Sequence, residues 1–148
     1  MKKPMPEEVN YDGCFDVEGG NFKAAGQVSS NIKNILKNLG CASDIVRRAA
    51  IVAYEAEINI VSYARKGVIR LYAKPDYVFL DVSDEGPGIP DIDLAMQEGY
   101  STASAMVREM GFGAGMGLAN MKRYSTDFEI TSVVDEGTRV VMRIVHQR

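Results

Sequence analysis

Three groups of residues in this chain carry side chains and backbone of the kinds that could bind a nucleotide. Glu55 precedes Asn59 by four residues, and Asp84 opens a segment that contains Gly86 and Gly88. Later in the chain, glycines recur at every second position. An acid near an amide can supply metal and water chemistry, an acid before a glycine turn can recognise a base edge, and glycines before a helix can receive phosphates. Together the three groups predict a nucleotide site.

Glu55 and Asn59 are expected to share one face of a helix, because residues four apart are neighbours on a helical surface. They border the apolar positions Ala56 and Ile60, where a polar group without a partner is costly. The alternative is a plain surface pair. Glu57 lies two residues from each and is expected to point elsewhere as a solvated charge, so Glu55 is the better candidate for a catalytic carboxylate.

Asp84 comes at the end of an apolar strand segment, residues 78–82. A carboxylate at that place can accept a hydrogen bond from the exocyclic amine of a base. Gly86 and Gly88 lack a Cβ, so the backbone could approach a flat base closely. The competing interpretation is an ordinary turn, since Asp, Gly and Pro are the residues that turns favour.

The third group consists of Gly111, Gly113, Gly115 and Gly117, followed by Leu118 in an expected helix. Glycines can turn successive amides toward one anion, and the helix adds its positive end. The run lacks the Gly-Lys-Ser/Thr of a P-loop, and no strand directly precedes it as in a dinucleotide fingerprint. A flexible glycine hinge is the alternative.

Apolar periodicity and turn residues predict the elements that position these groups. The expected order is a strand over 11–17, helices over 21–39 and from 43 to before Gly67, a hairpin over 68–73 and 77–82, a helix over 115–124, and a hairpin over 128–134 and 139–145. Asn21 and Ser43 are predicted to cap the two long helices. This order predicts an α+β two-layer sandwich, with helices on one face of a mixed, mostly antiparallel sheet.

The connection from Ser83 to about Met110 is unusually long for a compact domain and contains glycine segments. Such a connection is either disordered or functional. We favour a binding loop with a mobile lid from about Gly99 to Gly111.

Length and composition limit the possible classes of protein. A chain of 148 residues predicts one domain over 11–148, preceded by a flexible N-terminal arm over 1–10. The net charge of −3 argues against a nucleic-acid binder but not against small anionic ligands. Cys14 and Cys41 share no metal-type spacing and are expected to be reduced thiols. With neither a signal peptide nor a membrane span recognised, we expect a cytoplasmic protein.

These motifs, taken in order, resemble the GHKL ATPase superfamily, which includes gyrase-type ATPases, the ninety-kilodalton heat-shock chaperones, histidine kinases and mismatch-repair proteins. Glu55 and Asn59 match its N-box, the two glycine segments match its glycine boxes, and the late pair Gly137-Thr138 matches its terminal Gly-Thr. The resemblance covers about residues 15–146. It implies the Bergerat-type ATP-binding fold.

Within this superfamily the small size points to the bacterial anti-sigma-factor serine/threonine kinases. The segments 84–92, 99–102 and 113–118 are most similar to the switch kinase branch of the stressosome, as is the Asn-Ile pair at Asn59. Residues 105–110 depart from that branch, because they make the lid longer than expected.

The resemblance implies a role for each matching residue. Glu55 would be the general base, Asn59 would bind Mg²⁺, and Asp84 would accept a hydrogen bond from the adenine amine. The remaining cofactor-binding positions are Gly86 and Gly88 beside the base, Gly111, Gly113, Gly115, Gly117 and Leu118 around the phosphates, and Thr138, whose hydroxyl would support the adenine site.

The function implied is an ATP/Mg²⁺-dependent serine/threonine kinase of a partner-switching module. Its substrate would be an antagonist protein of the STAS type, and a sigma factor or a PP2C-type phosphatase would be the regulated partner. One alternative is a nucleotide-gated binding module, an anti-sigma factor or phosphatase activator that transfers no phosphate. Another is the detached catalytic domain of a histidine kinase, which the lack of a His-bearing helix before residue 40 disfavours. The sequence leaves open whether the chain forms a homodimer.

Overall fold

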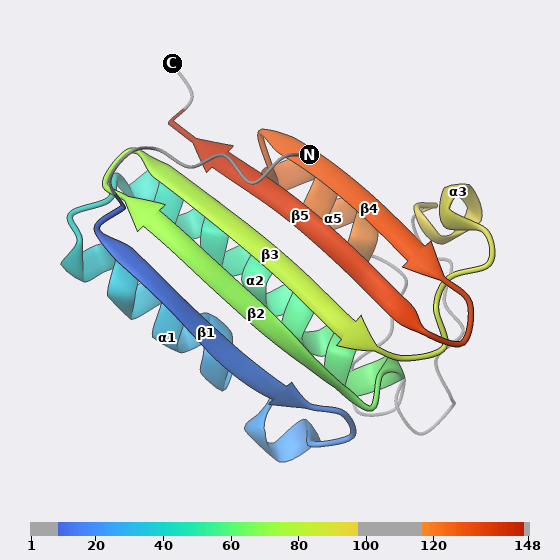
Figure 1. Ribbon diagram of the computed structural model, residues 1–148. Coiled ribbons are helices and arrows are strands. Elements are labelled where there is room, and N and C mark those ends of the chain that lie inside the picture. Colours follow the sequence, from blue (N-terminus) through green and yellow to red (C-terminus); the bar gives the residue numbers. More distant parts are fainter. Residues whose placement is uncertain (1–8, 98–116, 147–148) are drawn as a thin grey trace.

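The computed structural model describes residues 9–97 and 117–146 (Figure 1). Their elements follow the predicted order. They are β1 (Tyr11–Glu18), the 3₁₀ turn η1 (Phe22–Ala24), α1 (Gln27–Asn38), α2 (Ser43–Tyr63), β2 (Lys66–Lys74), β3 (Tyr77–Glu85), α3 (Ile92–Ala95), α5 (Gly117–Tyr124), β4 (Asp127–Val133) and β5 (Gly137–Val145). A short helix, α3, was not predicted, and Asp91 caps it by accepting a hydrogen bond from the amide of Leu94.

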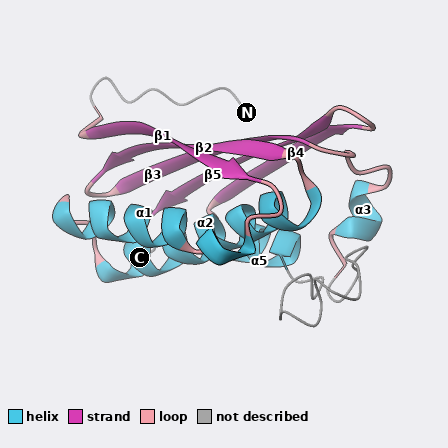
Figure 2. Cartoon of the chain, turned by 90° about the horizontal axis from the view of Figure 1, so that it is seen from below, coloured by secondary structure: helices cyan, strands magenta, loops and turns pink. Residues whose placement is uncertain are grey.

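The strands form one five-stranded sheet in the order β1-β2-β3-β5-β4. Each neighbouring pair in this order is antiparallel, so the described sheet is antiparallel throughout rather than mixed. Helices α1, α2 and α5 cover one face (Figure 2). The predicted α+β two-layer sandwich and both hairpins are therefore confirmed.

The core lies between this face of the sheet and α2. Alternate strand residues point inward, because side chains alternate across a strand, and they meet the apolar stripe of the helix. The fully buried members with large side chains include Ile45, Ile60, Ile69, Leu71, Leu80, Met142 and Ile144. Helix α2 is thus held along its length, which fixes the positions of the polar residues on its remaining faces.

Helix α1 begins later than the sequence predicted. Asn21 precedes only the single turn η1 and makes no capping hydrogen bond with its side chain. The helix begins at Gln27, after Gly26 with φ of 98°, a conformation that glycine adopts without a Cβ penalty. Gly26 has no side chain that could cap the free amides of the first turn.

A carboxylate from α2 caps α1 instead. Glu57 Oε2 accepts hydrogen bonds from the amides of Gly26 at 3.0 Å and Val28 at 3.2 Å, and Oε1 accepts one from Ser29 at 3.0 Å. Glu57 is only 2% exposed. The prediction of a solvated charge is therefore wrong: the negative charge lies at the positive end of α1, where the helix dipole and three charge-assisted bonds stabilise it.

The other predicted helix ends are partly corrected. Gly40, with φ of 81°, ends α1 as predicted, and the next amide, that of Cys41, bonds back to Leu36. Ser43 is the first residue of α2 and not its cap, since Ala42 occupies that position without a side-chain bond. Gly67 does not end α2; it lies inside β2, where a Cβ would come within 2.6 Å of the Ile60 side chain.

Buried Arg48, near the start of α2, joins this helix to α5 and β5. Its guanidinium, on a residue 3% exposed, donates to the carbonyls of Tyr124 at 3.1 Å and Val145 at 2.8 Å. It also bonds Thr126 Oγ1 at 3.1 Å and the carboxylate of Asp44 at 3.2 Å. Four partners satisfy a charge that would be costly if buried alone, and they fasten the C-terminal end of α5 to α2.

Two residues of the predicted N-terminal arm contact the sheet. Val9 packs against the cluster of Tyr72, Phe79 and Val141, and the Asn10 amide bonds to the carbonyl of Ala73. Residues 1–8 lie outside the described part of the chain. Within that part, no helix combines the length and the apolar character needed to cross a membrane.

Candidate nucleotide site

The N-box residues Glu55 and Asn59 both face the first residue of α5. A Cβ added to Gly117 would lie 3.0 Å from Asn59 Oδ1 and 3.2 Å from Glu55 Oε2. Both side chains are half-buried. The predicted placement on one helix face is therefore confirmed, and a side chain at position 117 would crowd both polar groups. The catalytic and metal-binding roles of the pair stay predictions.

The environment of Glu55 favours a carboxylate that can take up a proton. Burial raises the pKa of Glu55, and a hydrogen bond from the Asn120 side chain opposes that rise. A base with an elevated pKa accepts protons more readily near neutral pH. Sequence reasoning missed Asn120, although it follows Gly117 by three residues and so shares its face of α5.

Asp84 lies inside strand β3 rather than in a turn. It pairs with Gly67 of β2, and its side chain points to the inner face of the sheet. Asp84 Oδ1 accepts a hydrogen bond from the backbone amide of Thr138 at 3.1 Å. Burial raises the pKa of Asp84, and the Thr138 amide opposes this rise. One carboxylate oxygen is thus engaged by the protein.

The glycines near Asp84 allow two loops to touch backbone to backbone. Gly88, with φ of 73°, would place a Cβ 2.4 Å from the carbonyl oxygen of Val133, and Gly137 would place one 2.0 Å from that of Asp84. A Cβ on Gly86 would lie 3.1 Å from Ala64 Cα. Gly88 and Gly137 are therefore required by the protein's own packing, in addition to any approach by a base, whereas the space at Gly86 is only tight.

Ser132 of β4 connects these loops and was also missed. Its hydroxyl accepts a hydrogen bond from the Ile89 amide at 2.8 Å and lies 2.8 Å from Thr138 Oγ1 and 3.1 Å from the Gly137 carbonyl. The Thr138 hydroxyl is therefore bonded to β4. A lone serine in an expected strand gave no signal of this network, because Ile89 lies 43 residues away in another loop.

The second glycine box is only partly within the described residues. Gly111, Gly113 and Gly115 lie outside them, as do the lid predicted over 99–111 and its insertion at 105–110. Leu118 packs its side chain against the core, so any contact with phosphate would involve its backbone. In the described part of this box, Gly117 is the residue that the structure brings to the N-box.

Oxygen donors at the N-box suit a hard cation. Asn59 Oδ1 and Glu55 Oε2 approach the same point beside Gly117. Mg²⁺ prefers oxygen ligands and is commonly held by one or two side chains together with phosphates and water. No cluster of three or more His, Cys, Asp or Glu suited to a metal occurs among the described residues. The two oxygens would thus suit a cation whose other ligands come from a nucleotide and water.

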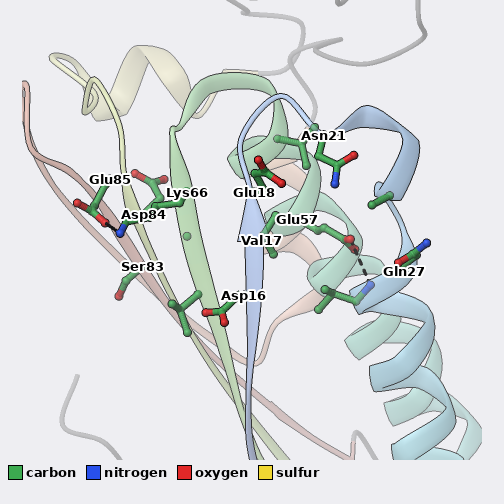
Figure 3. Close-up of a pocket in the computed structure, with 15 residues that line it drawn as sticks. Asp16, Val17, Glu18, Asn21, Gln27, Glu57, Lys66, Ser83, Asp84 and Glu85 are labelled. Carbon is green, nitrogen blue, oxygen red and sulfur yellow. Dashed lines mark hydrogen bonds and ion pairs between the residues drawn. The ribbon is translucent and has the colours of Figure 1, made fainter.

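A hollow of about 800 Å³ lies at the ends of β1, β2 and β3, beside the start of α1 (Figure 3). Asp84 and Glu57 line it, but Glu55 and Asn59 do not. Successive lining residues on each strand point to opposite faces of the sheet. The three strands stay hydrogen-bonded up to their last paired row, in which Lys66 lies between Glu18 and Glu85. The hollow therefore borders the candidate site at Asp84 without containing the N-box.

Comparison with known proteins agrees with this geometry. The family model described as "Histidine kinase-, DNA gyrase B-, and HSP90-like ATPase" matches residues 44–148. The serine/threonine-protein kinase RsbT of Bacillus subtilis is 34% identical over 112 residues, which cover 73% of this chain and 78% of that protein. The anti-sigma F factor of Caldanaerobacter subterraneus is 31% identical over 118 residues, 80% of this chain and 75% of its own.

The anti-sigma F factor of Thermoanaerobacter sp. is 30% identical over 118 residues, again 80% of this chain and 75% of the relative. The family match includes every described residue of the candidate site, from Glu55 to Thr138. The chain therefore belongs to the histidine kinase-, DNA gyrase B- and HSP90-like ATPase family, in its branch of serine/threonine-protein kinases and anti-sigma factors.

Proposed function

We propose that this chain is an ATP- and Mg²⁺-dependent serine/threonine protein kinase of a cytoplasmic partner-switching module. The observation that carries the proposal is the meeting of Glu55 and Asn59 at Gly117, the first residue of α5. It gives a proton acceptor and a cation ligand on one helix face, beside the helix that follows the second glycine box. The similarity to a serine/threonine-protein kinase supports the same assignment.

Each residue has a task in this proposal. Asp84 accepts a hydrogen bond from the adenine amine with a carboxylate oxygen that the Thr138 amide does not occupy. Asn59 offers its amide oxygen to Mg²⁺, which when bound neutralises phosphate charge. Glu55 takes the proton from the attacking serine or threonine hydroxyl as the γ-phosphoryl group leaves ATP.

The phosphates are held by the backbone amides of Gly111, Gly113, Gly115 and Gly117. Phosphoryl transfer asks little more of a protein than such positioning and charge stabilisation.

The phosphoacceptor in this proposal is a small antagonist protein of the STAS type. The regulated partner is a sigma factor or a PP2C-type phosphatase, which the kinase would hold until the antagonist releases it. Two relatives carry the name anti-sigma F factor, and this favours a second candidate function, a nucleotide-gated binding module without phosphotransfer. The half-buried carboxylate of Glu55 at the N-box favours the kinase.

Incubation with γ-labelled ATP, Mg²⁺ and STAS-type proteins from neighbouring genes tests the proposal. We expect label on a serine or threonine of one antagonist, and no label when GTP replaces ATP. Omission of Mg²⁺ is the matched control. If a partner binds in an ATP-dependent manner but no antagonist is ever labelled, the binding module replaces the kinase.

A further inference from the structure

Asn120 is a polar residue that neither the sequence motifs nor the family roles assign. It lies on α5, between Gly117, which meets the N-box, and Met121, which is 1% exposed in the core. Because Met121 is packed inside and Arg48 holds the C-terminal end of the helix at Tyr124, α5 has little freedom to rotate against α2. The face of α5 that carries Asn120 is therefore fixed toward α2.

Helices α2 and α5 run antiparallel, because Asn59 lies beside Gly117 and Arg48 bonds to the carbonyl of Tyr124. This arrangement places Asn120 beside Glu55, and a hydrogen bond from the Asn120 side chain opposes the rise that burial causes in the pKa of that carboxyl group. An ionised carboxylate can only accept hydrogen bonds, so the amide nitrogen of Asn120 must be the donor. Among the described residues, burial and this bond are the influences that shift the pKa of Glu55, and no charged side chain from α2 or α5 contributes. Asn120 is thus the described group that holds this carboxylate against free rotation.

The contact also ties Glu55 to the phosphate side of the site. Gly117, one turn before Asn120, lies where the amides after the second glycine box would meet phosphate. Because Met121 and Arg48 hold α5 in place, Asn120 would keep the Glu55 carboxylate at one position relative to Gly117. Misplacement of a reacting group by about 1 Å can cost roughly 100-fold in rate, so an orienting bond of this kind can decide turnover without touching substrate.

We propose that Asn120 is the positioning residue of the general base, orienting the Glu55 carboxylate toward the substrate hydroxyl. The inference rests on the proposed kinase function. It assigns to α5 a second task besides phosphate binding, because the same helix aims the base.

Asn120→Leu removes the donor and keeps a similar volume. Phosphotransfer at saturating ATP should fall about 10- to 100-fold, while ATP affinity measured by calorimetry stays within about twofold. Lys122→Leu introduces the same side chain at an exposed position of the same helix and should change neither quantity. If Asn120→Leu weakens ATP binding as much as transfer, Asn120 serves the nucleotide and the proposal is wrong.

A double-mutant cycle separates positioning from an independent effect. If Asn120 acts through Glu55, adding Asn120→Leu to Glu55→Gln should lower transfer by no more than about twofold beyond Glu55→Gln alone. If the double variant shows the product of the two single losses in phosphotransfer, Asn120 acts independently of Glu55 and the proposal is wrong. The comparison requires a wild type that transfers phosphate, so a wild type without transfer refutes the kinase function first.

The contact itself can be tested without activity. In ¹⁵N-labelled protein, one Asn120 side-chain amide proton should exchange slowly and should shift when Glu55→Leu removes its acceptor. Unchanged resonances in Glu55→Leu would show that the bond does not form in solution, and would refute the inference whether or not the protein is a kinase.

Discussion

At the proposed adenine end of the candidate site backbone touches backbone, whereas at its proposed catalytic end side chains meet. At the adenine end, comprising Asp84, Gly88, Ser132, Gly137 and Thr138, two glycines allow close backbone contact, and the side chains of Ser132 and Asp84 accept hydrogen bonds from backbone amides. At the catalytic end, comprising Glu55, Asn59, Gly117 and Asn120, two helices meet through polar side chains. The first should tolerate almost no change in shape, and the second should tolerate changes in chemistry without unfolding.

Glu55→Gln should give the largest effect and confine it to the catalytic end. Phosphotransfer should fall about 10²- to 10⁴-fold, because the proton acceptor is lost while the size of the side chain is kept. ATP affinity, measured by calorimetry, should stay within about twofold. Equal transfer rates for this variant and the wild type would remove Glu55 from the mechanism.

Asp84→Asn should give the opposite pattern. The new amide can still accept from the Thr138 amide through its oxygen, so the fold should survive. Its NH₂ group cannot accept from the adenine amine, and ATP affinity should fall about 100-fold. Calorimetry with ATP and GTP checks both parts, and an unchanged preference for ATP would mean that Asp84 does not recognise the base.

Gly88→Ala should show how rigid the adenine end is. The added methyl group would meet the Val133 carbonyl at 2.4 Å, at a residue with φ of 73°. The free energy of unfolding should fall by about 2–3 kcal/mol. Gly86→Ala is the matched control, since its methyl group meets Ala64 at 3.1 Å without a positive φ and should cost less. If both variants lost the same free energy of unfolding in urea titrations, the contrast between these two positions would be wrong.

Glu57→Gln tests whether the carboxylate that caps α1 behaves differently from Glu55, the proposed general base. The substitution leaves one of two acceptor oxygens and turns an NH₂ group toward backbone donors. Stability should fall by about 1–2 kcal/mol through loss of charge-assisted capping. Urea titration measures this loss, and a stability equal to that of wild type would return Glu57 to the role of a solvated charge.

Glu55→Gln should have the smallest and opposite effect on stability. Burial raises the folded-state pKa of Glu55 above its unfolded value, so at neutral pH the ionised group costs stability. The neutral variant should melt roughly 1–3 °C higher at pH 7. As the pH falls through the raised pKa, wild type gains a proton in the folded state and the difference should vanish. A melting temperature that falls at pH 7 would show that Glu55 supports the fold.

The fold and the residue pairings of the site followed from patterns that are local in sequence. Helical spacing placed Glu55 beside Asn59, and the apolar run 78–82 placed Asp84 directly after a strand, although β3 extends through Asp84 to Glu85. These arguments need only the periodicities of helix and strand. They therefore succeed wherever residues that contact one another in space are also close together in the sequence.

The failures came from partners that are distant in sequence. Asn21 is a good cap by type, yet the amides of α1 are satisfied by Glu57, about thirty residues away. Ser132 bonds the Ile89 amide across a separation of 43 residues. No local pattern distinguishes Glu57 from a surface acid or Asn120 from a surface amide. Their roles depend on how α2 packs against α1 and α5, which only the assembled fold determines.

The partners of Arg48 have a consequence for how this chain acquires its fold. Its acceptors on Thr126, Tyr124 and Val145 lie 76 to 97 residues further along the chain. During synthesis the central helix would be complete long before its guanidinium could be satisfied. The N-terminal half should therefore not mature ahead of the last hairpin, and the domain should fold as one cooperative unit. Splitting the chain in the loop between β3 and α5 should yield two fragments that fold only when combined.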